Sequence, residues 1–310
     1  MNGPARFPNV YDLSKVKASK LVFWGAGSVG SWAMSKLAYP WWRQIVIADP
    51  KNLKVENIER HWLDESWIGK PKAIGCRETL IEHGVPGEKV IAHVGDAEAI
   101  FEEHTDAAAA IVSVDDEDVK YRISAWCEKH NIPMIVGSVY AQGKGGQVVT
   151  LPHPDKVCFV CAQGALGNLE YSGHPADQNY GFDPTQFRSP EGAPQAVPSL
   201  GAPVGIIADW MAMSVMDVVA TTKKIDPTVL MIAFQDWVEV RRLRQGDIMR
   251  ELSEYIALQS KLSMQRTMMF GPEENGRFPL LIRNSTFPLA LERWSECTAH
   301  THDVTSASNI

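Results

Sequence analysis

Short apolar runs alternate with segments of helical spacing along the first half of the chain. The apolar runs have the length of strands and occur at 20–24, 45–49, 89–94, 109–114 and 132–137. Apolar residues recur at helical intervals between them, at about 30–37, 72–83, 96–104 and 119–130. Because buried parallel strands form continuous apolar runs joined by crossover helices, this alternation predicts an α/β fold with a doubly wound, mostly parallel sheet.

The pattern changes beyond residue 143, where alternating and Gly- and Pro-rich segments replace the regular repeat. In chain order, we expect an antiparallel strand at 146–151, a long crossover loop at 162–200, an apolar helix at 201–220, a further strand, a helix near 246–265 and strands near 279–291. A loop of this length is usually functional. The antiparallel strands are expected to extend the parallel sheet.

Composition and charge narrow the class of protein. The chain has 310 residues, 45% of them hydrophobic and 22% charged, which is typical of a globular protein. The net charge of −7 argues against nucleic acid as a partner, because phosphate binding requires a concentrated basic surface. We find no continuous apolar run of membrane-spanning length and no secretory signal at the N-terminus, so we expect a cytoplasmic protein without a membrane partner.

A glycine-rich turn follows the first predicted strand, in the sequence V22-F-W-G-A-G-S-V-G30. Gly25, Gly27 and Gly30 form the pattern G-x-G-x-x-G, which lets a backbone approach a phosphate at a helix N-terminus. Asp49 ends the next predicted strand, where an acidic residue binds ribose hydroxyls. This strand–turn–helix–strand unit predicts a Rossmann-like nucleotide site, and by itself it suits either NAD or ATP.

The residues after Asp49 favour ATP. The segments D49-P-K-N-L-K-V-E-N-I-E-R-H61, I68-G-K-P-K-A73 and V114-D-D-E-D118 resemble the ThiF/MoeB/ubiquitin-activating enzyme superfamily. The resemblance continues through G146-Q147 and C158-x-x-C161 and covers most of residues 18–220. It implies a triphosphate-binding set of Asn57, Arg60 and Lys72, with Asp115 holding the Mg²⁺–ATP complex. The chain departs from the family pattern at Lys51, His61 and Asp116, where a second acidic residue, Gln and Asn are usual.

The chemistry of adenylation suits these residue types. A carboxylate attacks the α-phosphate of ATP and expels pyrophosphate, so strong negative charge must be held and neutralised. Arg60 offers a planar fork of donors and Lys72 a point charge for the terminal phosphates, while Asp115 can position Mg²⁺. A NAD-dependent dehydrogenase needs none of these three residues, although each alone has an ordinary structural explanation as a surface charge or a helix cap.

The cysteines predict a structural zinc site. Cys158 and Cys161 have the spacing of half such a site. The family completes the site with a second C-x-x-C, for which this chain has only C297-T-A-H300. We therefore predict the ligand set Cys158, Cys161, Cys297 and His300, with His302 as a substitute for His300. The alternative is a pair of unligated cysteines and a polar tail. Cys76 and Cys127 fall in helical patterns and are expected to be buried.

The crossover segment E191-G-A-P-Q-A-V-P-S-L-G201 contains no cysteine. Family members that form a thioester carry a nucleophilic cysteine in this segment, and Ala196 lies roughly where some relatives place it. Two explanations remain open. Either the chain stops at the acyl-adenylate, as sulfur-carrier activators can, or a cysteine has been replaced by alanine.

The resemblance implies an enzyme that adenylates the C-terminal glycine of a ubiquitin-like or sulfur-carrier protein, in a bacterial conjugation system. It further implies a homodimer, and a ubiquitin-conjugating-type enzyme as a second partner. We expect a single adenylation domain at 1–302, with a nucleotide-binding half at 1–150, a half for the crossover loop, zinc and partner at 151–302, and a disordered tail at 303–310. The alternatives are a tRNA-modifying dehydratase of the same superfamily and a non-catalytic scaffold subunit.

Overall fold

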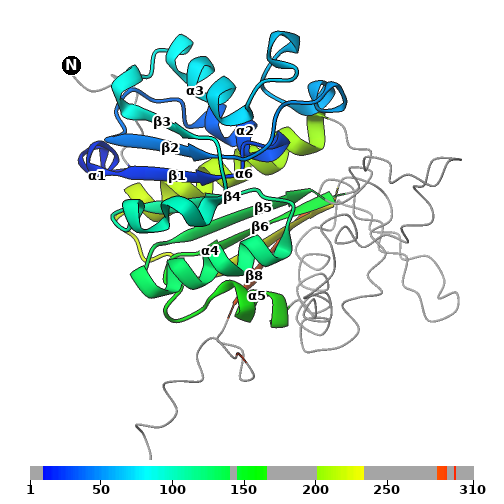
Figure 1. Cartoon of the computed structure of the whole chain (residues 1–310). Coiled ribbons are helices and arrows are strands. Elements are labelled where there is room, and N and C mark those ends of the chain that lie inside the picture. The colour runs from blue at the N-terminus through cyan, green and yellow to red at the C-terminus, as the bar shows by residue number, and fades with distance from the viewer. Residues whose placement is uncertain (1–9, 140–144, 166–200, 234–284, 292–296, 298–310) are drawn as a thin grey trace, which may run out of the picture.

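A single sheet organises the chain (Figure 1). The computed structural model describes residues 10–139, 145–165, 201–233, 285–291 and 297. These residues form an eight-stranded sheet in the order β3-β2-β1-β4-β5-β6-β7-β8. The strands are β1 (Lys20–Trp24), β2 (Gln44–Ala48), β3 (Val90–His93), β4 (Ala109–Val112), β5 (Met134–Val139), β6 (Gly145–Leu151), β7 (Thr228–Ala233) and β8 (Ser285–Ala290).

The direction of the strands changes at β6. The first five strands are parallel, and β6, β7 and β8 each pair antiparallel with the strand before them. This arrangement confirms the predicted fold class, a doubly wound parallel sheet extended by antiparallel strands. Because β1 pairs with β2 on one side and with β4 on the other, the strand order reverses between β1 and β4. Ligands of doubly wound folds bind at the carboxyl ends of strands at such a switch point.

Helices cover both faces of the sheet (Figure 1). The helices are α1 (Leu13–Ala18), α2 (Ser28–Lys36), α3 (Lys72–Glu82), α4 (Glu117–His130), α5 (Phe159–Ala165) and α6 (Gly201–Ala220), with 3₁₀ turns η1 (Val55–Arg60), η2 (Glu65–Trp67), η3 (Gly87–Lys89) and η4 (Ala97–His104). Side chains of α1, α2, α3 and α6 form one apolar core, and those of η4, α4 and α5 form another. Successive residues of β1 point into opposite cores, as a pleated strand requires.

The long helix α6 is a core helix of this sheet. Its buried side packs against α2 and against strands β4, β5 and β6. By length and composition alone α6 would also pass as a membrane span. Its contacts account for that composition, because a helix that packs on a sheet needs the same apolar residues.

Several elements differ from those predicted. Residues 162–165 belong to α5 and are therefore not part of a loop. The helix expected at 96–104 is the 3₁₀ segment η4, and the short helix α1 was not predicted. At seven residues, α5 is too short to show a helical period; buried Phe159, whose N–H donates to Ser124 Oγ (3.2 Å), anchors it to α4. The rest of the predicted loop, the helix near 246–265 and the tail lie outside the described residues.

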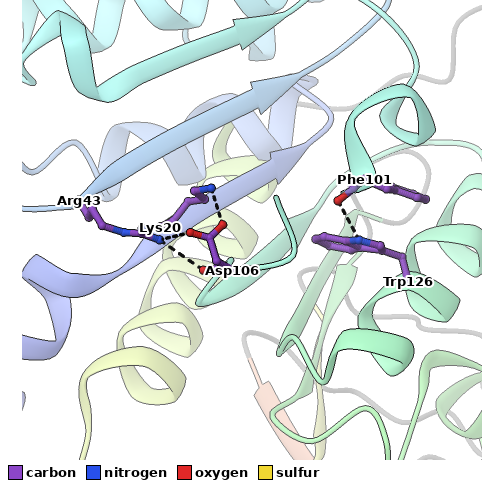
Figure 2. A network of polar contacts seen from close by, with 5 residues as sticks. All are labelled: Lys20, Arg43, Phe101, Asp106 and Trp126. Carbon is purple, nitrogen blue, oxygen red and sulfur yellow. Dashed lines mark hydrogen bonds and ion pairs between the residues drawn. The ribbon is translucent and has the colours of Figure 1, made fainter. Parts of the chain in front are cut away.

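A charged cluster joins three strands at their amino ends (Figure 2). Lys20 begins β1, Arg43 precedes β2, and Asp106 precedes β4. The Lys20 ammonium donates to Oδ1 of Asp106, and Arg43 Nη2 donates to Oδ2 at 2.7 Å. Partial burial would raise the pKa of Asp106, but the hydrogen bonds and charges of Lys20 and Arg43 outweigh it and lower the pKa to about 2. One carboxylate thus links the amino ends of β1, β2 and β4, opposite to the switch point.

Replacing Asp106 with Asn should destabilise the protein in a pH-dependent way. Because its pKa is lower in the folded protein, the carboxylate stabilises the fold above its unfolded pKa and loses this contribution as pH falls toward about 2. We expect a loss of about 1 kcal/mol at pH 7, since Asp106 is half exposed and its ion pairs are screened. Urea titrations between pH 3 and 7 measure the difference in the free energy of unfolding between wild type and Asp106→Asn. This difference should become smaller below pH 4. Asp155→Asn, at an exposed position, is the control, and a difference independent of pH would contradict this explanation.

Candidate functional site

The glycine turn lies against the end of β4. Gly25 has φ +96°, a conformation that favours glycine, and its N–H donates to Ala48 O at 2.9 Å. A Cβ at Gly30 would lie 2.2 Å from Ser113 Oγ and 2.4 Å from the Gly25 oxygen. Gly27 is the N-cap of α2 without a side-chain cap, so the N–H groups of the first turn of α2 face the switch point. This arrangement suits an anion at the helix N-terminus.

Asp49 is buried beside this turn. Its Oδ2 accepts a hydrogen bond from the Ala26 N–H and its Oδ1 accepts one from the Lys51 N–H, both at 2.8 Å. The backbone N–H of Asp49 donates to His93 O at the end of β3. These bonds fix the orientation of the carboxylate and leave each oxygen with capacity for a further donor. The geometry therefore fits a carboxylate that accepts from ribose hydroxyls.

The segment that carries Asn57 and Arg60 is tied to α2. Asn57 Oδ1 accepts from the Lys54 N–H at 3.2 Å and caps the 3₁₀ turn η1. Arg60 ends η1, and its carbonyl accepts from Trp32 Nε1 on α2 at 3.2 Å. Both Asn57 and Arg60 are half-buried. The arginine backbone is thus held next to the helix that begins at the glycine turn.

His61 connects this segment to the turn directly. It is 5% exposed, its Nε2 lies 2.8 Å from Ala26 O, and Leu63 N–H donates to its Nδ1 at 3.1 Å. Burial lowers the pKa of His61 to about 4; the hydrogen bond to Ala26 opposes this shift, and the charges of Lys72 and Arg60 reinforce it. Both cations therefore lie close enough to influence the same imidazole.

Lys72 is the first residue of α3 and is buried, with 8% of its surface exposed. Its N–H donates to Lys51 O, which places the start of α3 against the residues after β2. Burial raises the pKa of the Cys76 thiol, with an added rise from Asp49 and an opposing effect from Lys72. Lys72 and Asp49 thus both lie near Cys76.

Asp115 lies in the turn between β4 and α4, two residues beyond Ser113, and its side chain is exposed. The cap of α4 is Asp116, whose carboxylate accepts from the N–H groups of Asp118 and Val119. The helix cap considered as an alternative role for Asp115 therefore belongs to Asp116. Asp115 and the glycine turn therefore both lie at the carboxyl ends of the parallel strands.

Three thiols form a second cluster, next to α4. Cys158, Cys161 and Cys297 are buried, and their sulfur atoms lie within 4.8 Å of one another. The Cys158 sulfur is 3.9 Å from that of Cys161 and 3.6 Å from that of Cys297. Ligands of tetrahedral zinc, with Zn–S bonds of about 2.3 Å, would lie about 3.8 Å apart. The cluster thus fits a zinc ion, while His300 lies outside the described residues.

Two contributors to the site could not be identified from local pattern. Ser113 Oγ donates to Gly25 O at 3.0 Å and occupies the space next to Gly30. A lone serine after a strand carries no sequence signal, and only the β1–β4 pairing reveals its role. His61 stood out as a departure from the family pattern, but its link to Ala26 spans 35 residues and is not visible in the sequence. Ala196 and the crossover segment lie outside the described residues.

The chain matches the sequence profile described as the ThiF family over residues 5–265. This match confirms the resemblance drawn from the nucleotide-binding motifs. A curated relative, the tRNA threonylcarbamoyladenosine dehydratase 1 of Saccharomyces cerevisiae, is 36% identical over 69 residues. That alignment covers 22% of this chain and only 16% of the yeast protein.

Solved structures of E. coli MccB share the fold. One, in complex with ATP, has a TM-score of 0.58 at 13% identity and covers 93% of this chain and 68% of its own. Another, the microcin C7 biosynthetic enzyme MccB in complex with N-formylated MccA, has a TM-score of 0.57 at 14% identity and covers 93% and 69%. At this level of identity the likeness establishes the fold alone.

Replacing Gly30 with Ala should disturb both stability and nucleotide binding. The added methyl would overlap Ser113 Oγ and the Gly25 carbonyl, so the turn or β4 must shift. We expect a loss of about 1–3 kcal/mol in the free energy of unfolding and weaker ATP binding, measured by urea titration and calorimetry. Gly205→Ala is the matched control, because a methyl there meets no atom within 4 Å. Unchanged stability in Gly30→Ala would refute the close approach.

Proposed function

Because the chain belongs to the ThiF family, we propose that it uses ATP to adenylate a carboxylate of a partner molecule. Family members are adenylating enzymes. The observation that carries the proposal is the meeting of the glycine turn, the oriented Asp49 carboxylate and the buried Lys72 at the switch point of the sheet. Among the described residues Lys72 forms no ion pair, and a buried cation in such a position is suited to an anionic ligand.

Each of these residues would bind a different part of the nucleotide. Asp49 would accept from the ribose, and the N-terminus of α2 would face the phosphates. Arg60 and Lys72 would neutralise the charge of the leaving pyrophosphate, with Asn57 beside them, and Asp115 would hold Mg²⁺. In the reaction, a carboxylate oxygen of the partner attacks the α-phosphorus, and the bond to pyrophosphate breaks. The chain's contribution is orientation and charge neutralisation.

The partner we propose is a ubiquitin-like or sulfur-carrier protein whose C-terminal glycine supplies the carboxylate. The complex of MccB with N-formylated MccA supports a partner of this general kind, since a neighbour of the same fold binds a second molecule besides its nucleotide. We further propose a cytoplasmic homodimer. Whether the adenylate continues to a thioester depends on the crossover segment around Ala196, and a ubiquitin-conjugating-type enzyme would then be the next partner.

A second candidate is a dehydratase that adenylates a small carboxylate on tRNA. The alignment with the yeast tRNA threonylcarbamoyladenosine dehydratase 1 favours it. The net charge of −7 opposes it, because tRNA binding requires a basic surface. A non-catalytic scaffold is the third possibility, and burial of Lys72 next to the turn speaks against it.

The thiol cluster supports a structural zinc ion. We propose that Cys158, Cys161 and Cys297 bind it, with His300 as the fourth ligand. The three sulfur atoms have the spacing of tetrahedral ligands and are removed from solvent. The ion would join α5 to the segment that follows β8 and would have no part in the chemistry at the switch point.

Exchange of labelled pyrophosphate into ATP tests the proposed function. We expect exchange only when a partner protein ending in diglycine is present, because adenylate formation is reversible. Exchange that depends on tRNA with a small carboxylate would establish the dehydratase instead, and no exchange with either would favour the scaffold. Lys72→Ala should lower the exchange rate about 10²–10³-fold, by loss of charge stabilisation. Lys70→Ala, at an exposed lysine two residues away, is the matched control.

Metal analysis of the purified protein tests the zinc proposal. We expect about one zinc ion per chain, falling to near zero in Cys161→Ser and Cys297→Ser, because each substitution removes a thiolate ligand. Cys76→Ala removes a buried thiol outside the cluster and should leave the zinc content unchanged. A metal-free wild-type protein would show that the thiols have a packing role only.

A further inference from the structure

The side chain of His61 links the segment that carries Arg60 to the glycine turn by a hydrogen bond. Its Nε2 lies 2.8 Å from the carbonyl oxygen of Ala26, between Gly25 and Gly27. Its Nδ1 accepts from Leu63 N–H at 3.1 Å, within its own segment. The imidazole is 5% exposed, so these two bonds are made in a site from which water is excluded.

The two bonds require one tautomer of the ring. Since Leu63 N–H donates to Nδ1, that nitrogen carries no proton, and the proton must sit on Nε2, which then donates to Ala26 O. A second proton on Nδ1 would break the bond with Leu63 and place a positive charge among Lys72 and Arg60. Burial and these two cations lower the pKa of His61 to about 4. At neutral pH the ring is therefore uncharged, donates a hydrogen bond from Nε2 and accepts one at Nδ1.

Both ends of the bridge belong to parts of the phosphate site. Ala26 also donates its N–H to Asp49, so the peptide groups on either side of Ala26 are fixed by two different side chains. Arg60 immediately precedes His61, and its own carbonyl is held by Trp32 of α2. A shift of His61 would therefore move the turn relative to the arginine.

We propose that His61 is a positioning residue for nucleotide binding, which holds the glycine turn in register with the segment that presents Arg60. It would contact no phosphate itself. Its effect would arise because the turn's N–H groups and the guanidinium must meet the same polyphosphate, and each is carried by a different segment. This inference rests on the proposed function to the extent that ATP is the ligand.

Three substitutions separate this role from simple packing. His61→Gln keeps a side-chain donor long enough to reach Ala26 and an acceptor for Leu63. His61→Asn can still accept from Leu63 N–H, as asparagine does from the residue two positions on, but it is too short to reach Ala26. His61→Leu removes both bonds. His153→Gln, at an exposed histidine, is the control for the loss of an imidazole.

The dissociation constant for Mg²⁺–ATP, measured by calorimetry, is the main readout. We expect it to rise about tenfold in His61→Asn, which corresponds to the loss of one buried hydrogen bond, and to rise further in His61→Leu. His61→Gln should restore it to within about threefold of wild type. The melting temperature is measured in parallel, and binding is compared below the transition of every variant, so that a folding defect is not counted as a binding defect.

A spectroscopic measurement completes the test. Nitrogen NMR should show the His61 ring, assigned by its absence from the spectrum of His61→Asn, neutral and protonated at Nε2 at pH 5.5, where an exposed histidine is charged. The pKa of buried His104 is also lowered, so this assignment is needed. The inference is overturned if His61→Asn binds ATP as tightly as wild type, if His61→Gln fails as badly as His61→Asn, or if the ring is charged at that pH. If wild-type protein does not bind ATP at all, the proposed function fails as well.

Discussion

The close approach between the glycine turn and the end of β4 is the constraint on which the site depends. Gly25 and Gly30 leave no space for side chains there, and Ser113 uses the remaining space to donate to the Gly25 carbonyl. The turn leads directly into α2, which begins at Ser28 with Gly27 as its N-cap, so the N–H groups of its first turn are directed to the carboxyl ends of the strands. Asp49 and His61 then attach to Ala26, the residue between the first two glycines.

The charged residues at the amino ends of the parallel strands differ from those at the carboxyl ends in how their charges are compensated. At the amino edge, Lys20 and Arg43 share the carboxylate of Asp106, and their charges are compensated within the fold. At the carboxyl edge, Lys72 is buried beside a neutral histidine whose protonation it opposes. A protein keeps such a concentration of positive charge where a ligand brings the compensating negative charge.

Sequence reasoning predicted most of the fold because the parallel strands are buried on both faces. Such strands appear as continuous apolar runs, and the runs at 20–24 and 109–114 nearly coincide with β1 and β4. The glycine turn was predictable because such a turn restricts the residue types at fixed spacing, while the binding roles of its residues and of Asp49 stay predictions. The helix α5 was missed because seven residues do not show a period, and its stability depends on contacts with α4. Ser113 was missed for a related reason, since its partner Gly25 is 88 residues away.

The thiol cluster has a consequence for the unfolded chain. Cys158 and Cys297 are 139 positions apart, and the segment between them includes α6, β7 and β8. A link between the two sulfurs that persists in the unfolded chain closes a loop of that length and restricts the conformations available before folding. By chain-entropy arguments this restriction favours the folded state by about 4–5 kcal/mol. Where such a link forms, removing Cys297 would therefore forfeit this contribution in addition to its packing in the core.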